Sequence, residues 1–161
     1  MNLFLDTEFA DCGATQLVSL ALVSEDGRQE FYAERDPLPA EPTAFVAKHV
    51  YPLLNRGDAA ADDATFTTRL RAFLATVEYP HVIYDFPFDW HLFDLALRGF
   101  DLPAEIAAAC GPVPRLSGTL ANGSAVTEYT EAWFAAHPDA KRHHALMDAR
   151  AYRAGWLRAH R

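Results

Sequence analysis

A nearly unbroken apolar run, LVSLALV at residues 17–23, limits the folds open to this chain more than any other segment. A strand with so few polar positions is typical of the centre of a sheet that is covered on both faces. The turn sequence EDG follows and leads into a second run at residues 29–33, which predicts an antiparallel hairpin. A shorter apolar run at residues 3–6 predicts a further strand before it.

The remainder of the chain predicts one more strand, at residues 82–84, among segments with helical spacing. Helices are expected at residues 42–54, 63–77, 89–99, 127–136 and 143–158. Residues 101–126 are punctuated by Pro and Gly and are expected to form a connection around a short helical piece at 105–110. Three consecutive strands followed by helices predict a single α/β domain over residues 1–161, with a mixed sheet flanked by helices.

Composition and cysteine spacing indicate where such a chain resides. Half of the residues are hydrophobic, which is sufficient for a packed core. The N-terminal MNLFLDTEF lacks the basic start and longer apolar core of a signal peptide, and no segment approaches the roughly 20 apolar residues of a membrane helix. Cys12 and Cys110 have no metal-binding or redox spacing. We therefore expect a cytoplasmic protein with reduced thiols and no membrane partner.

The net charge of −8 has the wrong sign for a protein that holds long nucleic acid through its phosphates alone. An acidic chain can still act on phosphate esters if a bound cation supplies the positive charge. Asp6 and Glu8 offer the first ligands for such a cation. They stand two apart at the end of a strand and therefore share a face. Two adjacent carboxylates repel each other unless they are protonated or joined by a cation, although they could also be unrelated acids.

Two later segments carry further carboxylates. Asp89 opens a predicted helix after the strand at residues 82–84, where it could instead cap the helix through backbone amides. Asp148 lies on an alanine-rich helix, where a partly buried carboxylate needs a partner or a metal. The alternative for Asp148 is an exposed acid beside Arg150 or Arg153.

In this order, LDTEF, FPFDWHLF and HHALMDA resemble the motifs of the DEDDh 3′–5′ exonuclease superfamily, and within it the compact stand-alone bacterial exoribonucleases. The resemblance spans residues 3–153 and implies a ribonuclease H-like fold that forms a single exonuclease domain. It implies two divalent metal ions, Mg²⁺ (or Mn²⁺), and four carboxylates that hold them, those of Asp6, Glu8, Asp89 and Asp148. Asp6 would bridge both ions.

The implied reaction is hydrolysis at the 3′ end of RNA or of a short oligonucleotide, which releases nucleoside monophosphates. Two divalent ions roughly 4 Å apart can activate water and stabilise both the attacking and the leaving oxygen. Hard cations of this kind prefer carboxylate oxygens. The resemblance also places Thr7, Phe9 and Trp90 near the terminal nucleotide. For Phe9 and Trp90, the alternative is core packing.

The resemblance also implies a histidine general base, and two neighbouring histidines compete for that role. His144 shares a helix face with Asp148, four residues later, whereas the register H-x-A-x-x-D selects His143, five residues before it. If the helix begins near His144, then His143 belongs to the preceding loop and can move over the metal site. We therefore expect His143 to be the general base, because the imidazole pKa suits proton transfer near neutral pH.

Three alternatives stay open at the level of sequence. The same chemistry could act on single-stranded DNA ends, because the sequence does not identify a group that reads the ribose 2′-hydroxyl. The chain could also be a non-catalytic nucleic-acid-binding domain of this fold, or an acidic domain that only binds cations. The resemblance further suggests a homodimer. Within residues 101–126, Arg115 and Ser117 could contact phosphate or could belong to a solvated loop.

Overall fold

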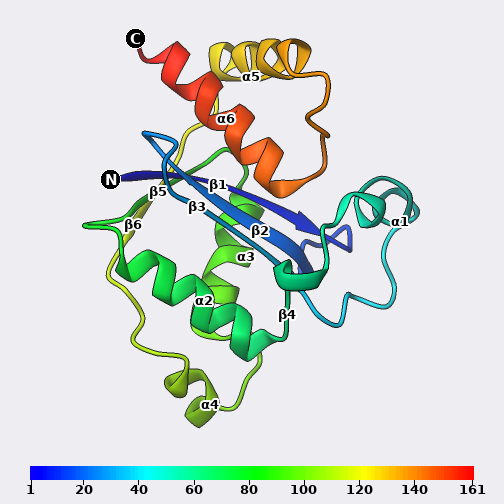
Figure 1. Ribbon diagram of the computed structural model, residues 1–161, viewed down its shortest axis with the longest axis vertical. Coiled ribbons are helices and arrows are strands. Elements are labelled where there is room, and N and C mark those ends of the chain that lie inside the picture. The colour runs from blue at the N-terminus through cyan, green and yellow to red at the C-terminus, as the bar shows by residue number, and fades with distance from the viewer.

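The computed structural model describes residues 1–161 as a six-stranded sheet between two layers of helices (Figure 1). The strands follow the spatial order β4-β3-β2-β1-β5-β6. The pairs β1–β2 and β2–β3 are antiparallel, whereas β1–β5, β5–β6 and β3–β4 are parallel. The predicted α/β architecture with a mixed sheet is therefore confirmed. The strands are β1 (Asn2–Phe9), β2 (Leu17–Ser24), β3 (Glu30–Arg35), β4 (Ala60–Ala61), β5 (His81–Tyr84) and β6 (Ser117–Leu120).

The helices lie on both faces of this sheet. On one face lie α2 (Asp63–Ala75) and α3 (Pro87–Arg98), and on the other lie α5 (Ser124–Ala136) and α6 (Ala145–Ala159) (Figure 1). Two shorter helices, α1 (Ala44–His49) and α4 (Ala104–Ala109), lie nearer the periphery, and short 3-10 turns occupy Tyr51–Leu53 and Gly57–Ala59.

The apolar run in β2 forms the centre of the molecule, as its sequence predicts. All eight residues of β2 are buried. Leu20 and Leu22 belong to the main core, which α2 and α3 help to form. Ala21 and Val23 belong to a smaller cluster on the opposite face, with Ala145 and Ala149 of α6 in contact. Small side chains at this second contact allow the α6 backbone to lie close to the sheet.

Several predicted helix boundaries move for identifiable reasons. The helix expected at residues 42–54 is only six residues long, because Pro52 cannot continue the α-helical hydrogen bonds and lies in a 3-10 turn. The second helix begins at Asp63, as expected, with the Asp62 side chain as its N-cap, but it ends at Ala75 and not at residue 77. The third begins at Pro87, a residue suited to a first helical turn, and ends at Gly99 in the left-handed conformation.

The connection predicted over residues 101–126 contains a strand that sequence reasoning missed. β6 pairs in parallel with β5 at the edge of the sheet, and all four of its residues are exposed. An edge strand of Ser, Gly, Thr and Leu has no apolar alternation to reveal it. A Cβ atom at Gly118 would lie 2.3 Å from the Trp90 ring, so only glycine allows this close approach.

Two predictions about location and redox state can be compared with the structure. No helix has both the length and the apolar composition needed to cross a membrane. Cys12 is exposed, Cys110 is buried, and neither forms a disulfide.

Candidate active site

Three carboxylates from two distant segments meet on one face of the sheet. Asp6 and Glu8 project from β1, and Asp148 projects from the first turn of α6. One oxygen from each of these side chains lies within 4.8 Å of the other two. The alternation of side chains along β1 explains why Asp6 and Glu8 share this face, as the D-x-E spacing predicts.

Burial and mutual repulsion disfavour negative charge in this cluster. Burial is the main cause that raises the pKa of Asp6 well above its usual range, and the charges of Asp148, Asp89 and Glu8 raise it further. Burial and the charges of Asp148 and Asp89 raise the pKa of Glu8 to about 8. Burial also raises the pKa of Asp148 to about 6, although backbone hydrogen bonds oppose the shift. Such a cluster gains stability from a proton or a cation.

Asp89 stands beside this cluster rather than within it. Its buried carboxylate accepts a hydrogen bond from the Thr7 hydroxyl at 2.6 Å, and burial raises its pKa to about 7. Thr7 points to the face of β1 opposite Asp6, where α3 carries Asp89. The Thr7 hydroxyl therefore orients Asp89. Backbone hydrogen bonds involving Thr7 and Phe86, the residue before α3, oppose this rise in pKa, so Asp89 also contacts the start of its helix, as the capping alternative predicts.

Asp85 is an additional acid that the sequence reasoning did not select. It directly follows β5 and lines the same pocket as Asp6 and Asp148. Its charge helps to raise the pKa of Asp6, Asp89 and Asp148. The available signal was its place after a buried strand, since β5 runs parallel to β1 and ends at the same edge of the sheet.

Asp148 also fixes the loop that carries the two histidines. Its Oδ2 accepts a hydrogen bond from the His144 backbone N–H at 3.0 Å, immediately before the first residue of α6, Ala145. His143 therefore lies in the loop, as expected if the helix begins near His144. The backbone of His143 has φ = 66°, in the left-handed region that non-glycine residues rarely adopt. Strained backbone of this kind is often found at functional sites.

The two histidines occupy different environments. His144 is buried and stacks on Tyr32, with ring centroids 4.7 Å apart. His143 is exposed, its ring lies edge-on to Phe45 at 4.9 Å, and it lines a pocket together with Glu8. Partial burial and the proximity of His49 and Arg142 lower the pKa of His143, which favours the neutral imidazole that can accept a proton.

Phe9 and Trp90, which were both predicted to contact the terminal nucleotide, also lie in different environments. Phe9 lines the pocket that contains Glu8 and His143, which has a volume of about 280 Å³ and mostly apolar walls. Trp90 stacks on Tyr84 with centroids 5.3 Å apart and packs against the main core, and it lines neither this pocket nor the one that contains Asp6. These contacts are those of the core-packing alternative for Trp90.

The residues present fit a hard divalent cation. Asp6 Oδ2 is buried and has no hydrogen-bond partner. The donor set consists of carboxylates alone, without the cysteine or histidine ligands that zinc prefers. Asp6, Glu8 and Asp148 would hold such an ion, and Asp89 and Asp85 lie near enough to affect the charge of the cluster.

No protein-family model and no curated protein sequence matches this chain. One fold can carry many activities, so the α/β architecture does not decide the function. The function is therefore inferred from the chemistry of the acidic cluster and the groups around it.

In the absence of divalent ions, we expect the stability of the protein to fall as the pH rises from about 4.5 to 8. The pKa of Glu8 is about 8 in the folded state, against 4.5 as its ordinary value, so the folded state binds more protons over this interval. Unfolding then releases protons, and a higher pH favours it. Each unit of pKa difference corresponds to about 1.4 kcal/mol. Urea unfolding in EDTA at several pH values measures the slope.

Glu8→Gln provides the control for this pH dependence, because it removes one of the raised carboxyl groups. The slope should become shallower in the variant, and Mg²⁺ should stabilise the wild type more at the upper end of the interval than at the lower end. A stability that increases with pH in EDTA, with the same slope in both proteins, would contradict the expectation.

Proposed function

We propose that this protein is a metal-dependent 3′–5′ exoribonuclease with a ribonuclease H-like fold. The observation that carries the proposal is the group of Asp6, Glu8 and Asp148, whose oxygens lie within 4.8 Å of one another while Asp6 Oδ2 lacks a partner. A mixed sheet with helices on both faces supports the fold assignment. The order of the three sequence motifs along the chain supports the choice of this superfamily.

Divalent ions, when bound, supply the positive charge that a phosphodiester needs and lower the pKa of water. The residues of the chain perform the other tasks. Asp6, Glu8 and Asp148 bind the cations, and Asp89, which Thr7 orients, is the fourth carboxylate. His143, in the loop before α6, accepts the proton of the attacking water.

The pocket beside His143 supports a role in binding the terminal nucleotide. Phe9, Phe45, Val46 and Val50 give it apolar walls, and Glu8 and His143 line it as well. Its volume of about 280 Å³ and its apolar surface suit a nucleobase, because stacking of a base on aromatic side chains is favourable. Glu8 belongs both to the wall of this pocket and to the acidic cluster. A nucleobase bound in the pocket would therefore place the last phosphodiester bond beside the cluster.

Digestion of 3′-labelled and 5′-labelled RNA in the presence of Mg²⁺ or Mn²⁺ tests the proposal. We expect stepwise shortening from the 3′ end, release of nucleoside monophosphates and no reaction in EDTA. Single-stranded DNA of matched sequence provides the comparison, and faster turnover of DNA would overturn the preference for RNA. The absence of cleavage with either metal would favour a non-catalytic binding domain.

A further inference from the structure

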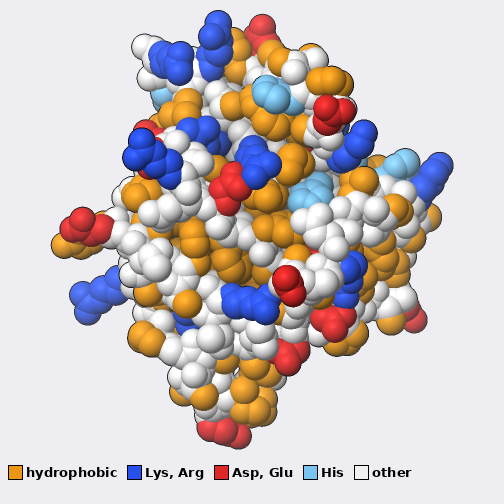
Figure 2. All heavy atoms as spheres, in the orientation of Figure 1, with side chains coloured by type: hydrophobic (Ala, Val, Ile, Leu, Met, Phe, Trp, Pro, Cys, Tyr) orange, Lys and Arg blue, Asp and Glu red, His pale blue; other side chains and the backbone are white.

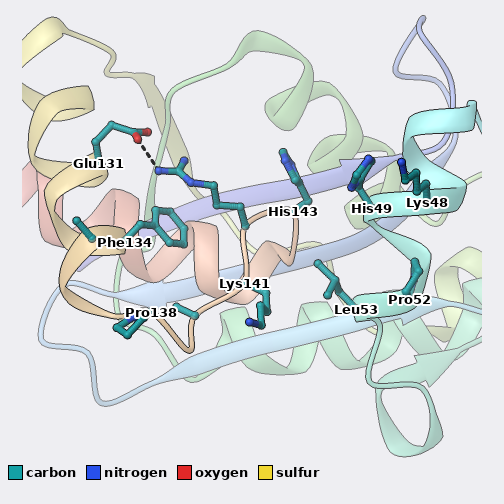
Figure 3. A pocket seen from close by; sticks show the side chains of 12 residues that line it. Lys48, His49, Pro52, Leu53, Glu131, Phe134, Pro138, Lys141 and His143 are labelled. Carbon is teal, nitrogen blue, oxygen red and sulfur yellow. Dashed lines mark hydrogen bonds and ion pairs between the residues drawn. The ribbon is translucent and has the colours of Figure 1, made fainter.

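The largest groove on the surface adjoins the candidate active site. Most of the basic side chains that line the groove come from two segments of the chain. The groove has a volume of about 630 Å³ and lies between α1 and the loop that joins α5 to α6. Lys48 and His49 come from α1, and Lys141, Arg142 and His143 come from the loop. In Figure 3, Lys48 and His49 lie on one side and Lys141 lies on the other, with the His143 side chain between them.

Unpaired lysine side chains line this groove, although the chain as a whole is acidic. Lys48 and Lys141 are the only two lysines in a sequence with a net charge of −8, and both line the groove. Both are exposed, and neither forms an ion pair. Glu131 is the single acid in the wall, and Arg142 already neutralises it through an ion pair at 2.5 Å. The groove therefore retains two uncompensated positive charges.

Several arginines of the chain are placed differently. Arg35, Arg56, Arg98 and Arg150 each pair with a carboxylate. On the face shown in Figure 2, basic and histidine side chains gather between the α5–α6 loop and α1. A local positive potential attracts anions to the groove, whereas the net negative charge of the rest of the protein repels them.

The groove adjoins the pockets of the candidate active site. It shares His143 with the pocket lined by Glu8 and Phe9, and it shares Arg142 with the pocket lined by Asp6 and Asp148. If the terminal nucleotide occupies the Phe9 pocket, the rest of the strand must leave past the acidic cluster. The pocket that contains Asp85 adds another carboxylate on one side, whereas the groove offers unpaired ammonium groups on the other.

We propose that this groove binds the phosphate backbone of single-stranded RNA on the 5′ side of the scissile bond. The inference rests on the proposed function and adds the path of the strand. Lys48 and Lys141 would bind phosphates as mobile point charges, without reading the sequence. The protein would thus combine a cation-dependent centre for the last phosphodiester with a short basic track for the preceding phosphates.

The double variant Lys48→Ala/Lys141→Ala tests this inference. For a long oligoribonucleotide, we expect KM to rise about tenfold or more, because each lost phosphate contact removes counterion release. For a dinucleotide without a 5′ phosphate, kcat and KM should stay unchanged, because no phosphate reaches the groove. Arg158→Ala/Arg161→Ala removes the same charge at exposed positions outside the groove, where neither arginine forms an ion pair, and should leave both substrates unaffected.

Binding of a labelled oligoribonucleotide in EDTA, measured by fluorescence anisotropy at several salt concentrations, separates the inference from the proposed function. The slope of log K against log salt should become less steep by about 1.4 in the lysine variant, since each contact with a single strand contributes about 0.7. Equal slopes in wild type and variant, or no binding at low salt, would overturn the inference even if RNA is hydrolysed. A reduced slope without any hydrolysis would retain the groove and reject the nuclease.

Discussion

Asp6→Asn is expected to reduce RNA hydrolysis by at least about three orders of magnitude and to stabilise the metal-free fold. The carboxylate belongs to the cation-binding group, and each tenfold in rate corresponds to about 1.4 kcal/mol of transition-state stabilisation. The same change removes one of several mutually repelling acids whose pKa values are raised by burial. Initial rates with Mg²⁺ and urea unfolding in EDTA measure the two effects.

The opposite signs of these effects distinguish a functional acid from a structural one. Replacing a carboxylate with a structural role would destabilise the protein. Replacing a catalytic metal ligand in a repulsive cluster would stabilise the metal-free protein. Asp101→Asn, the same substitution at an exposed position, should change neither rate nor stability appreciably. Activity within tenfold of the wild type, or a loss of stability in EDTA, would remove Asp6 from the proposed centre.

His143→Ala is expected to lower kcat by about 10²–10⁴-fold while the stability of the fold changes little. The side chain is exposed and lines the pocket with Glu8 and Phe9, so its loss removes the proposed proton acceptor without opening the core. Steady-state hydrolysis of RNA at saturating substrate gives kcat, and thermal unfolding gives the stability.

His144→Ala is the matched variant and should show the reverse pattern. His144 is buried and stacks on Tyr32, so its removal leaves a cavity and should destabilise the protein by roughly 1–3 kcal/mol. Turnover should be retained below the unfolding temperature. If His144→Ala loses turnover and His143→Ala does not, the roles of the two histidines must be exchanged.

Local patterns were sufficient to predict the centre of the fold. The apolar run of β2 predicted a strand covered on both faces, and its alternate residues do pack into clusters on opposite sides. The spacing of Asp6 and Glu8 predicted a shared face, because the pleat of a strand repeats every two residues. Asp148 joins them from a helix 140 positions later than Glu8, and only the resemblance to a known motif order linked the three in advance.

Other features required the tertiary structure because no local pattern encodes them. The edge strand β6 has four exposed residues and becomes visible only through its pairing with β5. The sequence left Trp90 open to a nucleotide contact or to core packing, and only the tertiary structure shows its contacts with Tyr84 and Gly118. Asp85 was not among the predicted site residues, and it lines a pocket with Asp6 because β5 runs parallel to β1.

The sequence by itself determined the four central strands, the pair of acids on β1 and the presence of two candidate histidines. These follow from periodicities of two and 3.6 residues, which are local properties of the chain. Only the tertiary structure decided which acids meet, which histidine is exposed, and that Lys48 and Lys141 line one groove beside the acids. Such meetings depend on how α1 and α6 pack against the sheet, and packing brings together residues whose separation along the chain carries no signal.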